Sequence, residues 1–240
     1  MVSFDFTGKV VLITGATGAL GRVVARQFHQ AGATLALCAR NQTLLSQLFA
    51  DLALSPQHLL IGGVDLRLPE DCDRLARAIE KRFGELHALV NTVGGFTAGP
   101  PVHETPVEAW EQMLEMNLRT AFLVSRAIVP LLLRAGGGAI VHVSGRAGLA
   151  GFAGGAGYCV AKAGVIRLTE VLAAELKEHS INVNCVLPGT IDTPANRAAR
   201  PDADFERWVS PEAIGEVIMF LCSPAARAIH GAAIPVYGLS

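Results

Sequence analysis

Short apolar segments alternate with helical stretches along this chain of 240 residues, and this alternation restricts the fold more than any other feature. Uninterrupted apolar runs are typical of strands that are buried on both faces. We expect strands at Val10–Thr14, Thr34–Cys38, His58–Val64, Leu86–Asn91, Ala139–Val143, Ile181–Leu187 and Ala233–Tyr237, with a helix at Ala19–Ala31 and further helices between most strands. Such an order implies right-handed crossovers and an α/β fold, a doubly wound parallel sheet with helices on both faces.

The composition indicates one soluble domain. No Ser-rich, Pro-rich or like-charged stretch divides the chain, so we expect a single domain over residues 1–240. The net charge of −1 offers no basic surface for nucleic acid or an anionic membrane, which leaves a small-molecule substrate as the expected partner.

Membrane insertion and secretion are not expected. The longest apolar run, near Ala121 to Leu133, contains Ser125 and Arg126 and is shorter than the roughly 18 to 20 residues that a span requires. The N-terminus lacks a basic segment followed by an apolar one, as a secretory signal would have. Five scattered cysteines without a C-x-x-C spacing predict neither disulfides nor a metal site. We therefore expect a cytoplasmic protein.

A glycine-rich segment follows the first predicted strand and opens the first helix. In Thr14-Gly-Ala-Thr-Gly-Ala-Leu-Gly21, glycines permit a tight turn and let the backbone approach a pyrophosphate at the helix N-terminus. The alternative is a tight turn that binds nothing. In a doubly wound sheet, ligands bind outside the carboxyl ends of the strands. The loops after Thr14, Cys38, Asn91, Val143 and Leu187 should therefore surround one crevice.

The end of the second predicted strand favours NADP(H) over NAD(H). NAD sites usually offer an acid about twenty residues after the glycines, which binds the ribose 2′-hydroxyl. This chain has Cys38-Ala-Arg40 instead, and a guanidinium can hold a 2′-phosphate with two hydrogen bonds. The alternative is that Arg40 is a solvated loop residue.

Five motifs in order make the chain resemble the short-chain dehydrogenase/reductase family over essentially its whole length. They are the glycine segment, Asp65-Leu66, Asn91-Thr-Val-Gly94, Tyr158-Cys-Val-Ala-Lys162 and Pro188-Gly-Thr-Ile-Asp-Thr193. The resemblance implies a Rossmann-type sheet of seven strands with the dinucleotide across its carboxyl edge. It also implies a homo-oligomer, a tetramer or a dimer, that uses the helices carrying Asn117 and Tyr158.

The resemblance also assigns residues to the cofactor. Asp65 would contact the adenine, Asn91 to Gly94 would line the adenosine ribose, and Ile191 and Thr193 would hold the carboxamide of the nicotinamide, while Lys162 would bind the nicotinamide ribose. The full set of expected cofactor contacts is Gly15, Thr17, Gly18, Leu20, Gly21, Arg40, Asp65, Leu66, Asn91, Val93, Gly94, Tyr158, Lys162, Pro188, Ile191 and Thr193.

Carbonyl reduction needs a proton donor beside the nicotinamide, and Tyr158 is the candidate. A phenol with a pKa of about 10 is a weak acid or base near neutrality unless positive charge favours its phenolate. Lys162 lies one helical turn further on and faces the same way, so it can supply that charge. The resemblance gives Asn117 a water-linked proton path to Lys162. A buried aromatic beside an extended lysine is the structural alternative.

One position departs from the family pattern in a way that bears on the substrate. A serine usually stands thirteen residues before the tyrosine and binds the substrate oxygen, but here that position is Gly145. Ser144 is adjacent, yet neighbouring residues at a strand end point to opposite faces, so it is a poor substitute. Phe96 and Phe152 lie in loops near the expected nicotinamide. We take these four residues as tentative substrate contacts.

The small residue at the serine position, Ala19 within the glycine segment, and the stretch Leu187–Arg197 all look like the dihydropteridine reductase branch. Arg40 and Asn117 do not fit that branch. The leading prediction is an NADP(H)-dependent oxidoreductase that acts on a carbonyl or alcohol with Tyr158 and Lys162. A quinonoid dihydropteridine reductase is the second reading. The third is a dinucleotide-binding sensor or scaffold with weakened catalysis, because the serine is missing.

Overall fold

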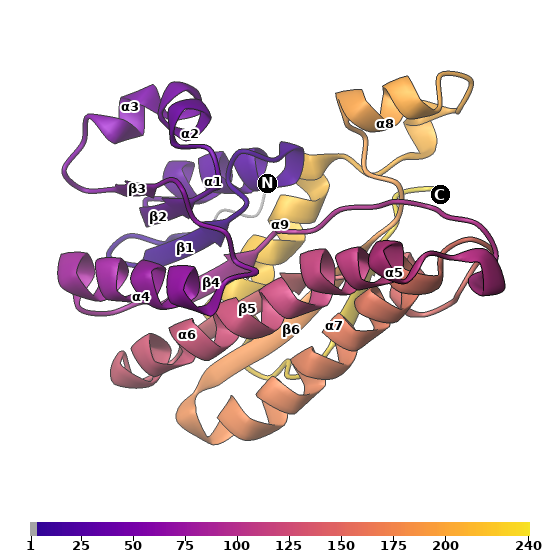
Figure 1. The fold of residues 1–240 in the computed structure, drawn as a ribbon. Coiled ribbons are helices and arrows are strands. Elements are labelled where there is room, and N and C mark those ends of the chain that lie inside the picture. The colour runs from indigo at the N-terminus through magenta and orange to yellow at the C-terminus, as the bar shows by residue number, and fades with distance from the viewer. Residues whose placement is uncertain (1–3) are drawn as a thin grey trace.

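A parallel sheet forms the centre of the computed structural model, which describes residues 4–240 (Figure 1). Its strand order is β3-β2-β1-β4-β5-β6-β7. The strands are β1 (Val10–Thr14), β2 (Thr34–Cys38), β3 (Leu59–Ile61), β4 (Ala88–Asn91), β5 (Gly138–Val143), β6 (Ile181–Pro188) and β7 (Ala233–Val236), and every pair of neighbours is parallel. The doubly wound fold predicted from the sequence is confirmed.

Helices cover both faces of the sheet (Figure 1). One face packs against α1 (Ala19–Gln30) and α9 (Pro211–Cys222), and the other packs against α4 (Pro69–Phe83), α6 (Thr120–Arg134) and α7 (Ala156–Leu176). The remaining helices are α2 (Gln42–Leu48), α3 (Ala50–Ala53), α5 (Val107–Leu114) and α8 (Pro194–Ala199). Because helices bury both faces, the strands are mainly apolar, as the apolar runs in the sequence indicated, and polar residues such as His142 and Asn184 within them are buried as well.

Most predicted strand boundaries agree with the structure within two residues, and β3 differs most. It covers three residues, whereas the sequence predicted His58–Val64. The strand ends at Ile61 because Gly62 packs directly on the backbone of Gln42 and Gly63 turns the chain with a φ of +64°. His58 also leaves the ladder, since its Nδ1 accepts a hydrogen bond from the Leu35 N–H.

The chain changes direction between β1 and β4, which are neighbours in the sheet. From β1 the chain builds outward through β2 and β3, and after β4 it builds the other way through β5, β6 and β7. The carboxyl ends of β1 and β4 therefore diverge into loops that leave a crevice between them. Residues from Thr14 and Asn91 onward are the ones that the topology brings to this crevice.

The continuous helical stretch Val107–Arg134 is long and apolar enough to cross a membrane by length and composition alone. Within the fold it consists of α5, a π-helical turn and α6, and α6 packs its apolar side chains against the sheet. A buried core helix meets the same criteria, so this stretch is weak evidence for a span.

Candidate functional site

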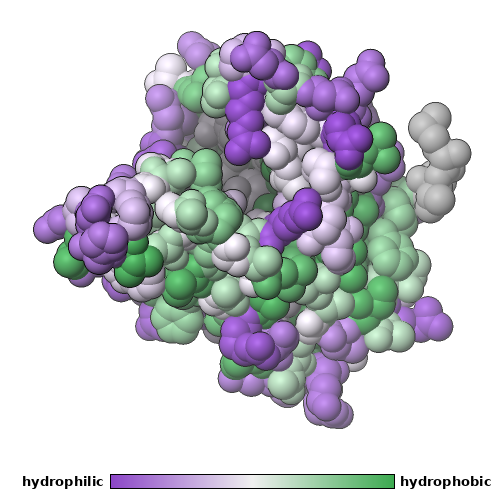
Figure 2. Space-filling view, turned by 90° about the vertical axis from the view of Figure 1, so that its right-hand side faces the viewer, coloured by the Kyte–Doolittle hydropathy of each residue, from purple (hydrophilic) through white to green (hydrophobic). Residues whose placement is uncertain are grey.

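A cavity of about 220 Å³ opens at the carboxyl edge beside β1. It is lined by residues that follow four neighbouring strands and by the turn before α6. Its lining includes eight residues predicted from the sequence, which are Gly15, Thr17, Gly18, Arg40, Asp65, Leu66, Val93 and Gly94. In Figure 2 one face of the molecule is hollowed in its upper part, with mainly hydrophilic residues above the hollow. The crevice predicted from the strand order is therefore a real depression on this edge.

The glycine-rich turn shapes one wall of this cavity. Gly15 has a φ of +65°, which side-chain-bearing residues rarely adopt, and its carbonyl accepts a hydrogen bond from the N–H of Gly18. A Cβ atom at Gly21 would overlap that same carbonyl oxygen. The N-cap of α1, Gly18, provides no side-chain acceptor, so no side chain caps the first N–H groups of this 12-residue helix. Such a helix start fits a pyrophosphate.

Two hydroxyl groups hold the β1 and β4 ends together behind the cavity. Thr14 Oγ1 donates to Asn91 Oδ1 at 2.6 Å, and Thr92 Oγ1 donates to the Thr14 carbonyl at 2.7 Å. Three further residues predicted as cofactor contacts lie next to lining residues but are not themselves part of the cavity lining; they are Leu20, Gly21 and Asn91. Their predicted role as direct cofactor contacts remains a prediction.

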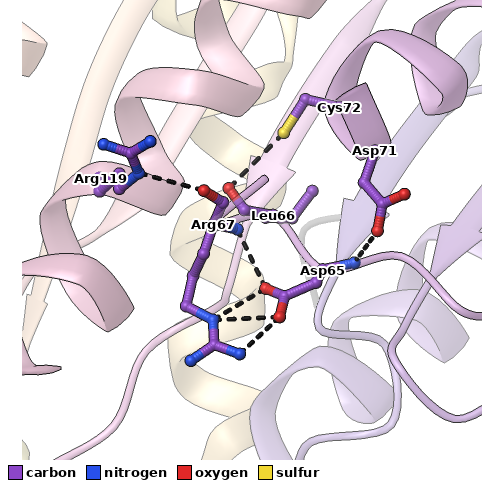
Figure 3. Close-up of polar contacts among 6 residues, drawn as sticks. All are labelled: Asp65, Leu66, Arg67, Asp71, Cys72 and Arg119. Atoms are coloured by element: carbon purple, nitrogen blue, oxygen red, sulfur yellow. Dashed lines mark hydrogen bonds and ion pairs between the residues drawn. The ribbon is translucent and has the colours of Figure 1, made fainter. Parts of the chain in front are cut away.

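The cavity floor on the β3 side carries an ion pair that the sequence analysis missed (Figure 3). Arg67 donates to both carboxylate oxygens of Asp65, with Nε at 3.0 Å from Oδ1 and Nη2 at 2.5 Å from Oδ2. This guanidinium holds the pKa of the Asp65 carboxyl below its ordinary value, and Arg40 lowers it further. Arg40 itself is exposed at the end of β2, on the same cavity.

Further along the edge, Tyr158 meets the loop after β5. A Cβ atom at Gly145 would lie 3.5 Å from Tyr158 Oη and 3.9 Å from the carbonyl oxygen of buried Pro188. Gly145, in the loop after β5, therefore lies next to the phenol, at a distance where an added Cβ atom would make ordinary contact with the hydroxyl. A serine at position 145 would be within reach of whatever binds at the hydroxyl.

Lys162 and Asn117 approach one glycine from two different helices. A Cβ atom at Gly94 would lie 2.8 Å from Asn117 Oδ1 and 3.2 Å from Lys162 Nζ. Lys162 is buried and donates to the Val143 carbonyl at 3.0 Å. The lysine ammonium lies 5.7 Å from the centre of the Tyr158 ring. The predicted residues Asn117, Lys162 and Tyr158 therefore lie near one another at this edge, beside the backbone of Gly94.

Asn117 owes its position to a π-helical turn, Glu115–Arg119, between α5 and α6. Its Oδ1 accepts from the Gly95 N–H at 3.1 Å, while its Nδ2 donates to the Gly95 carbonyl at 3.0 Å. An isolated π turn inserts one extra residue into a helix and occurs frequently at functional sites. Here it turns the amide toward the loop after β4.

Burial favours the neutral form of both Tyr158 and Lys162, so it shifts their pKa values in opposite directions. It raises the pKa of the Tyr158 phenol and lowers the pKa of the Lys162 ammonium to about 8. A positive charge at Lys162 would favour the phenolate, but burial and then the neighbouring Cys159 raise the pKa of Tyr158. Near neutral pH the phenol is protonated and can act as a proton donor.

Ser144 is not brought to the phenol. Its side chain is buried and its Oγ donates to the Lys162 carbonyl at 2.8 Å, on the α7 side of the strand end. This agrees with the alternation of side chains that made Ser144 a poor substitute. Its hydroxyl instead joins the end of β5 to α7 at Lys162, within the helix.

Phe96 and Phe152 lie beside Tyr158. The ring of Phe96 meets the Tyr158 ring edge-on at 4.9 Å between centroids, and Phe152 lies 6.2 Å from Phe96. Both phenylalanines are about half exposed. Apolar rings that remain in water next to a polar centre provide a surface for a flat or apolar ligand.

The loop after β6 carries Ile191 and Thr193. The Thr193 hydroxyl caps α8 by accepting from the Asn196 N–H at 3.2 Å, and the Ile191 carbonyl accepts from Asn196 Nδ2 at 2.8 Å. The carbonyl oxygen of Pro188, the last residue of β6 before this loop, lies 3.9 Å from the position of a Cβ atom at Gly145. A role for Ile191 and Thr193 in binding a carboxamide stays a prediction.

Thr92, which also lines the cavity, lies in the predicted range Asn91 to Gly94. Several lining residues were not predicted, namely Cys38, Ala39, Val64, Arg67, Met116 and Thr120. Most are immediate neighbours of predicted residues, and the strand-end rule could have included them. Arg67 is different because it had its own signal: a charged residue two positions after Asp65, at the carboxyl end of a strand.

Comparison with known proteins gives a consistent result. A family model described as short chain dehydrogenase matches residues 9–204. A 3-oxoacyl-[acyl-carrier-protein] reductase of Thermotoga maritima is 32% identical, over 96% of this chain and 97% of its own. A cyclohexanol dehydrogenase of an Acinetobacter species is 30% identical, over 99% of this chain and 97% of its own.

Solved structures resemble the fold closely. A carveol dehydrogenase of Mycobacterium avium, in complex with NAD, superposes with a TM-score of 0.88 at 27% identity and covers 98% of each chain. A short-chain dehydrogenase of Shigella flexneri, complexed with NADP, also has a TM-score of 0.88 at 26% identity, covering 98% of this chain and 99% of its own. Both nicotinamide cofactors thus occur among similar structures.

Proposed function

The chain belongs to the short-chain dehydrogenase family, and on that premise we propose that it is an NADP(H)-dependent oxidoreductase that transfers hydride between the nicotinamide and a carbonyl or alcohol substrate. The observation that carries this proposal is the convergence of Tyr158, Gly145, Lys162 and Asn117 on the carboxyl edge, beside a cavity with glycine and arginine walls. We further propose a cytoplasmic homo-oligomer. Half-exposed Phe122 on α6 and Val171 on α7 support association through these helices.

The proposed residues divide the reaction between them. The bound nicotinamide supplies or accepts the hydride. In the reduction direction, Tyr158 Oη donates its proton to the substrate oxygen while the carbonyl carbon receives the hydride, and the alcohol forms. Lys162 stabilises the resulting phenolate and binds the nicotinamide ribose, and Asn117 carries the water-linked proton path to Lys162. The oxidation direction reverses each transfer.

The proposal is tested first by initial rates of NADPH and NADH oxidation with purified protein. The substrates are a panel of ketones, β-ketoacyl thioesters and quinonoid dihydrobiopterin. We expect turnover with at least one carbonyl class and a lower KM for NADPH. Cofactor binding without turnover across the whole panel would contradict the enzyme proposal and favour a sensor or scaffold.

Arg40→Ala tests the cofactor preference. Removing the guanidinium at the end of β2 should raise the dissociation constant for NADPH about tenfold, because a charge-assisted bidentate contact is lost. NADH lacks the 2′-phosphate, so its dissociation constant should stay within about twofold of the wild-type value. Fluorescence titration measures both. Equal weakening of the two cofactors would show that Arg40 does not recognise the phosphate.

Gly145→Ser tests whether the absent hydroxyl limits carbonyl reduction. The added Cβ lies at ordinary contact distance from Tyr158 Oη, so the serine can reach a substrate oxygen. With a ketone substrate we expect kcat to rise, by up to about 10²-fold, because oxyanion donors contribute at that level. Gly145→Ala is the matched control, since it adds the same Cβ without a hydroxyl.

A quinonoid pteridine remains the second candidate substrate. The absence of a side chain at Gly145, beside the Tyr158 hydroxyl, and the half-exposed rings of Phe96 and Phe152 favour a flat molecule that does not require the serine. Selective pterin turnover that Gly145→Ser leaves unchanged would support this substrate. Pterin turnover below that with ketones would exclude it.

A further inference from the structure

Asp65 and Arg67 both line the cavity where the adenosine half of the proposed cofactor would bind. Figure 3 shows their carboxylate and guanidinium paired with each other. The carboxylate is fully engaged by one residue. Asp65 Oδ1 accepts from the Arg67 N–H and Nε, each at 3.0 Å, and Oδ2 accepts from Nε at 3.1 Å and Nη2 at 2.5 Å. The pair is therefore electrically neutral as a unit.

Neighbouring contacts hold both residues in place. The Asp65 N–H donates to Asp71 Oδ2 at 2.7 Å, and Arg119 Nε donates to the Arg67 carbonyl at 3.0 Å. Arg119 belongs to the π-helical turn that positions Asn117. Both ends of the short segment are thus tied to separate helices, so the ion pair is a defined part of the cavity wall.

Arg40 lines the same cavity and interacts electrostatically with the Asp65 carboxylate. The Asp65 carboxyl is stabilised in its ionised form first by Arg67 and also by the more distant charge of Arg40. Without Arg67, an unpaired carboxylate would face Arg40, attract its guanidinium and repel a phosphate monoester, which carries close to two negative charges (about −1.5 to −2). An acid in this region would act against a 2′-phosphate, as the acid of NAD-binding sites does at the second strand.

We propose that Arg67 is a specificity residue that neutralises Asp65, so that Arg40 remains free to bind the 2′-phosphate of NADP(H). This inference rests on the proposed cofactor preference. The two arginines would have different roles: Arg40 binds the phosphate directly, and Arg67 acts indirectly by neutralising Asp65. Removing Asp65 should therefore make Arg67 dispensable.

A double-mutant cycle tests this coupling with ligands that need no turnover. The probes are adenosine 2′,5′-bisphosphate and adenosine 5′-monophosphate, titrated calorimetrically into wild type, Arg67→Ala, Asp65→Asn and the double variant. The readout is the ratio of the two dissociation constants, which cancels any effect on the adenine contact. Arg67→Ala should reduce the preference for the bisphosphate about tenfold, and the double variant should return it to within about twofold of wild type.

Arg134→Ala is the matched control, because it also frees a carboxylate, that of Glu80, from an arginine at 2.8 Å, but lies outside the cavity lining. Retained binding of the monophosphate shows that each variant is folded. If wild type itself does not prefer the bisphosphate, the proposed NADP(H) preference fails, and this inference fails with it. If wild type prefers it but Arg67→Ala leaves the ratio unchanged, or Asp65→Asn does not restore it, the role of Arg67 alone is overturned.

Discussion

Tyr158→Phe should lower kcat by about 10² to 10⁴-fold, the range over which a positioned general acid or base contributes. The variant keeps the ring that packs edge-on against Phe96 and removes only the hydroxyl that faces Gly145. The cofactor dissociation constant should therefore change little while turnover is lost. Stopped-flow measurement of a single turnover with bound NADPH separates the chemical step from binding and release.

The only other tyrosine in the sequence supplies the control for this experiment. Tyr237 lies near the C-terminus with the Arg146 guanidinium 5.2 Å above its ring, and we propose no part for it in the reaction. Tyr237→Phe also removes one hydroxyl from a ring, so it should retain near wild-type kcat. Turnover by Tyr158→Phe at the level of Tyr237→Phe would refute the proposed proton donor.

The order of elements was readable from the sequence because strands buried on both faces leave uninterrupted apolar runs. The runs at Val10–Thr14 and Thr34–Cys38 coincide with β1 and β2. Lys9 and Gly15 flank the first run, and Gly32 and Arg40 lie two residues beyond the ends of the second. The predicted strand at 58–64 is longer than the observed β3, which covers Leu59–Ile61. The end of β3 depends on Gly62 lying against the backbone of Gln42, a contact between segments that local pattern does not record.

Site residues could be predicted from the sequence where a motif or a strand end points to a single residue. They could not be predicted where the site depends on two distant segments coming into contact. The position of Gly145 beside Tyr158 followed from the family resemblance, in which the residue thirteen positions before the tyrosine lies at the substrate. The π-helical turn at Asn117 was not predicted, because nothing in the residue pattern of the continuous helical stretch marks where one extra residue is inserted. Likewise the sequence suggested that the Lys162 charge lowers the pKa of Tyr158, but burial, a property of the assembled fold, raises it.

Lys162→Met should change how stability depends on pH as well as abolish efficient turnover. Burial lowers the pKa of the Lys162 ammonium from 10.5 to about 8 in the folded chain, whereas the unfolded chain keeps the ordinary value. Between these values the unfolded state binds the proton and the folded state does not, so wild type gains stability as pH rises. From pH 7 to pH 10 the gain relative to Lys162→Met should be about 2 to 3 kcal/mol.

The difference in stability between pH 7 and pH 10 reports the burial of the charge only if the hydrogen bond from Lys162 to the Val143 carbonyl contributes equally at both pH values. The experiment therefore needs a control that isolates the burial of the charge. Lys177→Met removes an exposed lysine at the end of the same helical segment. Urea unfolding of the three proteins at pH 7 and pH 10 gives each free energy of unfolding. Lys177→Met should follow the wild-type pH dependence within about 0.5 kcal/mol, as surface substitutions usually do.

A Lys162→Met protein that also follows the wild-type pH dependence would mean that the Lys162 ammonium remains hydrated in the folded chain. In that case Lys162 would keep its charge well above pH 8, and its support of the Tyr158 phenolate would extend across the alkaline range.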